Sequence, residues 1–131
     1  MKVGEINQSV SINCTPLKLY NLLLDSKQHS KLSNSVVQIN KRKGGKFSIF
    51  DGYCDGYNIE LIPGTKIVQA WNFKEDGWPE DHYSICTFKF SLQGDKTKLI
   101  FHQTNIPEHK VASLKQGWKR YYWEPLKAMF K

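Results

Sequence analysis

Four histidines and three cysteines are the residues of this 131-residue chain that most readily bind metals or act as nucleophiles. They are His29, His82, His102 and His109, together with Cys14, Cys54 and Cys86. Zinc sites are normally built from local pairs such as Cys-x-x-Cys or His-Glu-x-x-His, and the chain has neither spacing. Three cysteines without a close pair indicate buried free thiols in a reducing compartment. The sequence therefore predicts neither a metal site nor a disulfide.

A hydrolytic triad can be sought in Asp81-His82 beside Ser84. A triad is defined by geometry, however, and the strained Gly-x-Ser-x-Gly turn that exposes a serine nucleophile is missing. A polar loop entering a strand is the better interpretation. An enzyme of the cyclase or hydrolase type would have only Glu124, His102 and the tyrosines for proton transfer, and no pattern brings them together. We therefore expect no catalytic residues and no enzyme activity.

A cluster of cations is the clearest charged feature of a chain whose formal net charge is +7. It consists of Lys41, Arg42, Lys43 and Lys46, around a Gly44-Gly45 turn. These side chains can contact phosphates or an acidic protein surface, although a solvated turn is the more usual interpretation of such a segment alone. Nucleic-acid binding would require aromatic side chains on the same exposed face, and a phosphate loop would lead into a helix. We expect neither nucleic acid nor a cofactor as a ligand.

Trp78 lies in an otherwise acidic segment, residues 74–81, that contains Gly77 and Pro79 and is expected to form a loop. An exposed tryptophan would be an anchor for a partner protein, because interface hot spots favour Trp in a small desolvated pocket. The alternative is that Trp78 folds back and covers the open end of the sheet. The exposure of the side chain decides between the two. Trp78 and the four basic residues are our candidate partner contacts.

A single globular domain spanning residues 1–131 must position these side chains. With 40% hydrophobic and 13% aromatic residues, the composition excludes a disordered chain, a collagen-like repeat and a coiled coil. No apolar run approaches the roughly 18 residues of a membrane span. Alternating apolar and polar residues predict a first strand at residues 6–12. Further strands are predicted at residues 36–39, 46–50, 57–61, 66–73 and 84–92, and after Gly94-Asp95, where Leu99, Phe101 and Gln103 share one face.

Two short helices are predicted after the first strand, and one long helix at the end of the chain. Thr15-Pro16 supplies an N-cap and a first helical residue, so the first helix begins there and ends near residue 25; the second covers residues 27–32. From Pro107 onward one helical stripe is apolar. It consists of Val111, Leu114, Trp118, Tyr121, Tyr122 and Met129. Pro125 removes a backbone donor within this helix and predicts a bend.

The order of these elements predicts an α+β fold in which a curved antiparallel sheet of about six to seven strands grips the long C-terminal helix. Seven side chains would face each other between sheet and helix. They are Trp71, Phe88, Phe101, Gln103, Trp118, Tyr121 and Tyr122. They either fill the space as an ordinary core or line a ligand cavity, since cavities are mainly apolar with a few polar groups. The sequence leaves both possibilities open.

Short motifs distributed over nearly the whole chain carry a family resemblance. They are Gly44-Gly45-Lys46-Phe47, Asp51-Gly52, Leu61-Ile62-Pro63-Gly64, Trp71-Asn72-Phe73, Trp78-Pro79-Glu80-Asp81-His82 and the closing Gly117-Trp118-Lys119-Arg120-Tyr121-Tyr122-Trp123-Glu124-Pro125-Leu126-Lys127. The chain resembles the C-terminal domain of activators of the heat-shock protein 90 ATPase. The closing motif is typical of the wider START-like and Bet v 1-like helix-grip superfamily, and the Trp-Pro-Glu-x-His segment favours the activators.

The resemblance implies a cytoplasmic co-chaperone-like module that binds heat-shock protein 90 and favours its closed, ATP-hydrolysing state. Catalysis would then belong to the partner. No segment resembles the separate N-terminal domain of the well-studied activators, which implies weak or conditional activation. The alternative is a binding protein for a small apolar, lipid-like molecule held between the sheet and the C-terminal helix. Neither function involves a membrane.

Overall fold

The computed structural model describes all 131 residues, which form seven strands and a C-terminal helix preceded by two shorter ones. The strands are β1 (Val3–Ile12), β2 (Gln38–Ile39), β3 (Lys46–Ile49), β4 (Cys54–Ile62), β5 (Lys66–Phe73), β6 (Ser84–Gln93) and β7 (Lys96–Pro107). The two shorter helices are α1 (Pro16–Leu24) and α2 (Ser26–Ser33). After the 3-10 turn η1 (Glu108–Lys110), the C-terminal helix consists of three consecutive parts: α3 (Val111–Trp118), the π-helical turn η2 (Lys119–Trp123) and α4 (Glu124–Met129). None of these helices is both long enough and apolar enough to cross a membrane.

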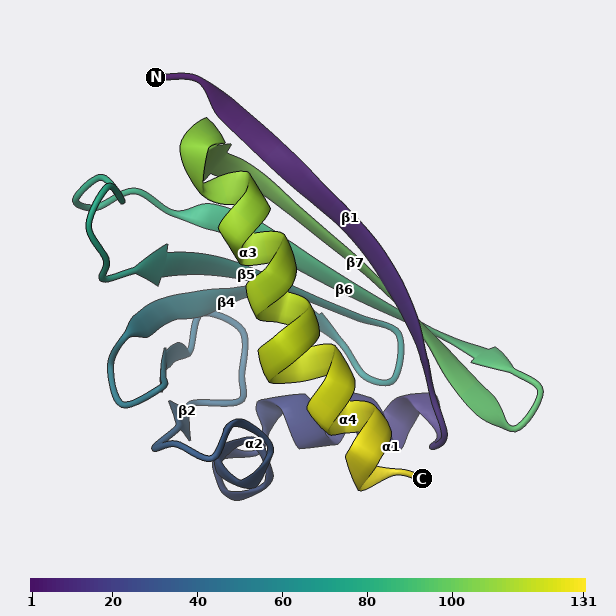
Figure 1. Ribbon diagram of the computed structural model, residues 1–131. Helices are drawn as coiled ribbons and strands as arrows, with labels where there is room; N and C mark the ends of the chain where they lie inside the picture. Colours follow the sequence, from purple (N-terminus) through teal and green to yellow (C-terminus); the bar gives the residue numbers. More distant parts are fainter.

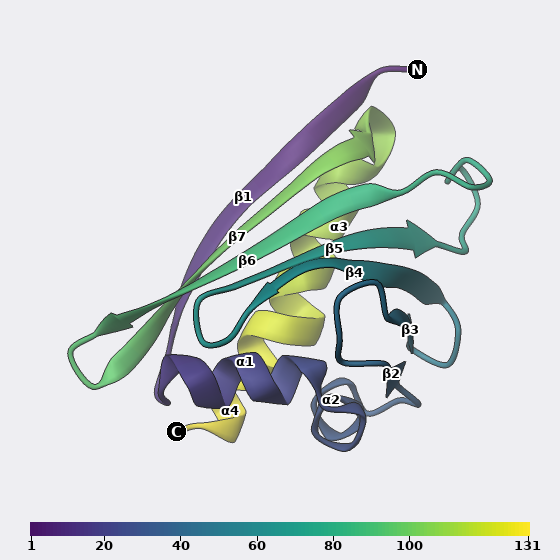
Figure 2. The ribbon, with the colours of Figure 1, turned by 180° about the vertical axis from the view of Figure 1, so that it is seen from behind.

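The seven strands form one antiparallel sheet in the order β1-β7-β6-β5-β4-β3-β2. The sheet curves around the C-terminal helix, which lies diagonally across its concave face (Figure 1). Seen from behind, α1 and α2 close one end of the sheet and leave its convex face open (Figure 2). The predicted α+β helix-grip architecture is therefore confirmed.

Local sequence explains why two short helices follow β1. The Thr15 hydroxyl accepts a hydrogen bond from the backbone N–H of Lys18 at 3.3 Å, and Pro16 occupies the first turn of α1. Asp25 ends α1 and at once caps α2, since its carboxylate accepts from the Gln28 N–H at 2.8 Å. Asn34 ends α2 in the left-handed conformation, with φ 52°. The predicted bounds of both helices are correct to within one or two residues.

Three strands differ from their predicted bounds. β1 begins at Val3, three residues before the predicted start at residue 6. Residues 36–39 were expected to form a strand, but only Gln38–Ile39 pairs, with Phe47 and Ser48 of β3. β4 begins at Cys54 rather than near residue 57, because the chain reverses sharply through Phe50 and Asp51, both at positive φ, and re-enters the sheet three residues early. The β6–β7 hairpin is confirmed, with Phe88 opposite Phe101 and Cys86 opposite Gln103 on the concave face.

The C-terminal helix contains a π turn directly before Pro125. The backbone N–H of Glu124 donates to the carbonyl of Lys119, five residues back, instead of to Arg120. Pro125 then lies in the first turn of α4, at a position where a missing N–H leaves no intrahelical bond broken. The extra residue in the turn moves the buried stripe by one position, so Leu126 is fully buried and Met129 is 42% exposed. The predicted inward orientation of Met129 is therefore wrong.

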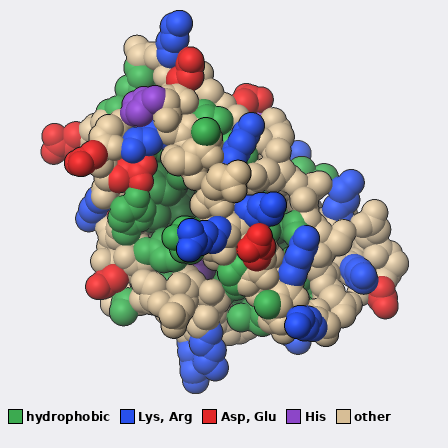
Figure 3. All heavy atoms as spheres, in the orientation of Figure 1, with side chains coloured by type: hydrophobic (Ala, Val, Ile, Leu, Met, Phe, Trp, Pro, Cys, Tyr) green, Lys and Arg blue, Asp and Glu red, His purple; other side chains and the backbone are tan.

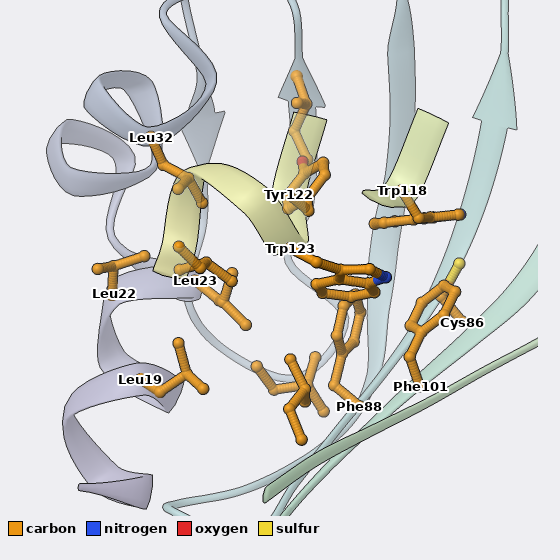
Figure 4. Close-up of a cluster of buried hydrophobic side chains, with 14 of the residues drawn as sticks. Leu19, Leu22, Leu23, Leu32, Cys86, Phe88, Phe101, Trp118, Tyr122 and Trp123 are labelled. Carbon is orange, nitrogen blue, oxygen red and sulfur yellow. The ribbon is translucent and has the colours of Figure 1, made fainter. Parts of the chain in front are cut away.

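The core is an aromatic cluster between helix and sheet. The indole rings of Trp118 and Trp123 are nearly parallel, with centroids 5.7 Å apart, and Phe101 lies 4.3 Å from Trp118 (Figure 4). Leucines of α1, among them Leu19 and Leu23, close the same cluster at the helical end. The closing sequence motif thus supplies the centre of the core.

Candidate functional site

A cavity of about 180 Å³ lies between the C-terminal helix and the β4–β5 part of the sheet. In the space-filling view it is the apolar hollow to the left of the helix (Figure 3). Nine of its twelve lining residues are hydrophobic. They are Phe50, Tyr53, Cys54, Trp71, Phe73, Leu114, Trp118, Tyr121 and Tyr122, with Glu75, Ser113 and Gly117 completing the wall. An apolar hollow with few polar groups is the usual form of a small-molecule site.

The cavity has one charged lining residue, Glu75, and its carboxylate is held from two sides. The Tyr53 hydroxyl donates to Oε2, and the Lys110 Nζ lies 3.3 Å from Oε1. Partial burial, and then the hydrogen bond to Glu75, raises the pKa of Tyr53, so the phenol stays protonated and keeps donating. Both Glu75 and Lys110 are about one fifth exposed, and the ion pair therefore borders the cavity rather than lying in open solvent.

Four of the seven side chains predicted to face the interior line this cavity: Trp71, Trp118, Tyr121 and Tyr122. Tyr121 forms its outer wall, 49% exposed, with its ring 5.9 Å from that of Phe50. Tyr121 therefore lines the cavity as predicted, and its place in the π turn leaves the ring half exposed at the outer rim.

The other three predicted cavity residues, Phe88, Phe101 and Gln103, do not line the cavity and instead fill the core. Gln103 accepts a hydrogen bond from the Trp118 indole N–H at 2.7 Å and donates through Nε2 to the Ser84 hydroxyl at 2.9 Å. Its buried amide is thus satisfied without a ligand. For these three positions the ordinary-core interpretation is the correct one.

Several cavity residues were not predicted from sequence, chiefly Phe50, Tyr53, Cys54 and Glu75. Phe50 was expected to end a strand, but its φ of 53° turns its side chain towards the helix. Burial raises the pKa of the Cys54 thiol, which keeps it protonated and poorly reactive. From the sequence, Gly52 between Phe50 and Cys54 predicts only a turn. A cavity wall made of turn residues has no periodic pattern from which it could be predicted.

The four basic candidates are all exposed: Lys41, Arg42 and Lys43 lie on the turn between β2 and β3, and Lys46 is the first residue of β3. The turn is fastened to the sheet by buried Asn58, whose Nδ2 donates to the carbonyls of Asn40 and Arg42 at 2.9 and 3.1 Å. Backbone bonds join Gly44 N–H to the Asn58 carbonyl and Asn58 N–H to the Gly45 carbonyl. The backbone that carries these cations is therefore fixed to the sheet.

A chain of buried amides connects this turn to the cavity. The Trp71 indole N–H donates to Gln69 Oε1 at 2.9 Å, and Gln69 Nε2 donates to Asn58 Oδ1 at 2.9 Å. Trp71 thus belongs both to the cavity wall and to the support of the basic turn. Gln69 and Asn58 were not predicted, because a polar residue in a strand is normally assigned to the solvent face.

Trp78 is 7% exposed and is not a surface anchor. Its ring packs 4.8 Å from that of Phe73, and its indole N–H donates to the His82 carbonyl at 2.8 Å. Two histidine hydrogen bonds hold the loop around Trp78 in place. The side chain of His82, in the loop, bonds to the Asn105 carbonyl of β7, and the side chain of His109, in η1, bonds to the Gly77 carbonyl of the loop. The alternative in which Trp78 covers the end of the sheet is correct, and the exposed-anchor prediction is wrong.

The residues considered for catalysis are far from forming one site. His102 lies on the convex face of the sheet, 3.6 Å from the Glu5 carboxylate, whereas Glu124 is exposed on the helix. Tyr122 is engaged with buried His29. No group of three or more His, Cys, Asp and Glu side chains is placed to hold a metal ion.

Comparison with known proteins identifies the family. Residues 13–131 match the family model described as Activator of Hsp90 ATPase homolog 1-like protein. The chain belongs to this family. Among curated proteins it is 31% identical over 116 residues to the human activator of 90 kDa heat shock protein ATPase homolog 1, and 32% identical over 118 residues to the Dictyostelium discoideum homologue. These matches cover 88% and 89% of this chain but only 34% and 30% of the relatives. The chain spans about a third of their length.

Solved structures of Hsp90-activator-like proteins share the fold. An HSP90 activator from Plasmodium falciparum has a TM-score of 0.88 at 28% identity, covering 95% of this chain and 94% of its own. The Aha1 dimer from Colwellia psychrerythraea has a TM-score of 0.80 at 20% identity, covering 97% and 96%. The predicted family is therefore confirmed. In this chain the closing sequence motif, residues 117–127, forms the π turn and the Trp118–Trp123 part of the core. The motif is therefore evidence for the fold rather than for a particular activity.

Proposed function

We propose that this domain binds heat-shock protein 90 and stimulates its ATPase by favouring the closed state. The observation that carries the proposal is the match, along nearly the whole chain, to proteins named as activators of that ATPase. The domain brings no catalytic group of its own, and hydrolysis belongs to the partner. Three buried free cysteines agree with a reducing, cytoplasmic compartment.

The proposed mechanism is a population shift. A bound domain raises turnover only if it has a higher affinity for the closed chaperone than for the open one, since equal affinity shifts nothing. The basic turn is the proposed contact, because Lys41, Arg42, Lys43 and Lys46 are all exposed and the Asn58 bonds hold the turn in place before binding. A turn whose backbone is already ordered loses little backbone entropy on docking.

The steady-state ATPase rate of purified heat-shock protein 90, titrated with this domain, tests the proposal. We expect a saturable rise that an inhibitor specific to the chaperone abolishes. Glutamate at all four basic positions should weaken binding at low salt, whereas glutamate at Lys27, Lys31, Lys89 and Lys96, four exposed lysines elsewhere, gives the same change in net charge and should not. A flat titration together with no binding by calorimetry would refute the proposal.

A second function, binding of a small apolar molecule, is supported by the cavity beside Trp71 and Trp118. An engineered apolar cavity of about 150 Å³ holds benzene, so a hollow of 180 Å³ accommodates a molecule of about one aromatic ring rather than a lipid. Mass spectrometry of solvent extracts of the purified domain, with a Leu114→Trp variant that fills the cavity as control, tests this function. A small molecule recovered from the parent and not from the variant would support it; extracts without any bound molecule would count against it.

A further inference from the structure

The sheet has one long open edge, the outer side of β1. β1 is ten residues long and pairs only with β7, whereas the opposite edge strand β2 has two residues. Figure 2 shows β1 as the free border of the sheet, with neither helix nor loop lying outside it. The backbone N–H and C=O groups on this side have no partner strand.

The usual protections of an edge strand are missing from the second half of β1. Proteins normally block such edges with lysine, proline or a bulge in the strand. Here the strand contains no lysine or proline, its one charged residue is Glu5, and its irregularity in pairing lies between Gly4 and Ile6. From Gln8 to Ile12 the register with β7 is regular, so this stretch has the geometry that an added strand requires.

A groove runs between this edge and the C-terminal helix. It is lined by Gln8, Ser9 and Val10 of β1 and by Lys119, Trp123, Glu124 and Lys127 of the helix. Ser9 and Val10 are neighbours in the strand, so their side chains point to opposite faces of the sheet. Both can line the same groove only if the groove runs along the edge of the strand. The groove therefore opens along the free edge.

The charges around the groove select the partner. Lys119 and Lys127 are exposed on its helical side, and Glu124 is its only acidic residue. Figure 3 shows Lys and Arg side chains gathered along this helix, with a single acidic side chain among them. A second copy paired edge to edge would bring two such basic faces together, at a formal charge of +7 on each chain. Charge therefore disfavours a second copy and favours an acidic chain.

We propose that the edge of β1 from Gln8 to Ile12 binds an extended acidic segment of a partner protein, which adds an eighth strand to the sheet. Backbone hydrogen bonds to β1 would supply affinity, and carboxylates on alternate residues would pair with Lys119 and Lys127. This surface is separate from the basic turn and from the cavity, and the proposal does not depend on heat-shock protein 90.

Fluorescence anisotropy with a labelled peptide of roughly nine residues, glutamate alternating with valine or threonine, provides the test. We expect saturable binding at low salt and slower amide hydrogen exchange at alternate residues within β1. The Lys119→Glu/Lys127→Glu variant should bind about tenfold more weakly, because two surface ion pairs become repulsive. The matched Lys27→Glu/Lys31→Glu variant should bind like the parent, and a peptide with lysine for glutamate should not bind.

A peptide that carries N-methyl groups on alternate amides separates strand addition from simple charge attraction, since it keeps the charges and cannot form the ladder. Binding of the methylated peptide as tight as that of the parent peptide would overturn the proposal. So would exchange protection confined to residues 41–46, or β1 protection that rises with protein concentration without peptide, which would assign the edge to a second copy.

Discussion

The Nε2 atom of His29 lies 2.7 Å from the hydroxyl oxygen of Tyr122, and both side chains are buried. The other ring nitrogen, Nδ1, lies 2.9 Å from the Leu23 carbonyl and must therefore carry the proton. Nε2 is then the acceptor of the Tyr122 O–H. This bond fastens α2 to the π turn of the C-terminal helix, and it requires neutral histidine.

The His29 bond predicts an acid-sensitive fold. Burial lowers the pKa of His29 from 6.5 to about 4. Between pH 6.5 and pH 4 the unfolded chain binds a proton at His29 that the folded chain does not. The contribution of His29 to the free energy of unfolding is therefore fully present above pH 6.5 and is lost as the pH falls towards 4. The loss from this group is about 3 kcal/mol. Urea unfolding between pH 7 and 4 measures it, and NMR titration should give a folded-state pKa near 4; a value near 6.5 would contradict this account.

A Trp118→Ala substitution should destabilise the domain by about 3–5 kcal/mol. The side chain is 3% exposed, packs against Phe101 and Trp71, and its loss leaves the buried Gln103 carbonyl without a donor. Tyr121→Ala removes a half-exposed ring from the same cavity and should cost under about 1 kcal/mol. Urea unfolding of both variants checks the contrast, and equal losses would contradict the burial of Trp118 in the aromatic core.

The fold was predictable because strands and helices leave periodic patterns of apolar residues in the sequence. Much of the site could not be predicted, because it depends on single residues in turns. Alternation located β1, β6 and β7, and the Thr15-Pro16 cap located α1. The cavity wall depends on Phe50 at positive φ and on a π turn that reorients Tyr121, and neither leaves a repeat in the sequence. Buried Asn58 likewise has no periodic signature, since only tertiary contacts make a buried amide favourable.

Two glycines predict opposite effects of the same substitution. A Cβ at Gly56 would lie 1.7 Å from the Ala70 carbonyl oxygen, a backbone atom that cannot move without opening the β4–β5 ladder. Gly56→Ala should therefore cost more than about 3 kcal/mol or prevent folding. A Cβ at Gly117 meets nothing within 4 Å in a helix, and Gly117→Ala should stabilise by about 0.5–1 kcal/mol. Thermal unfolding distinguishes the signs, and stabilisation at position 56 would contradict the close approach of β4 and β5.

The π turn makes a prediction that separates this structure from a regular α-helix. With regular α-helical spacing Met129 shares the inward face of Trp118 and Tyr122, whereas the extra residue in η2 buries Leu126 and leaves Met129 exposed. Leu126→Ala should therefore cost about 2–5 kcal/mol, and Met129→Ala less than about 1 kcal/mol, although both remove a large apolar side chain from the same helix. Urea unfolding gives both values. A larger loss at position 129 would mean that the helix is regular through Pro125, and the outward placement of Tyr121 beside the cavity would then be wrong as well.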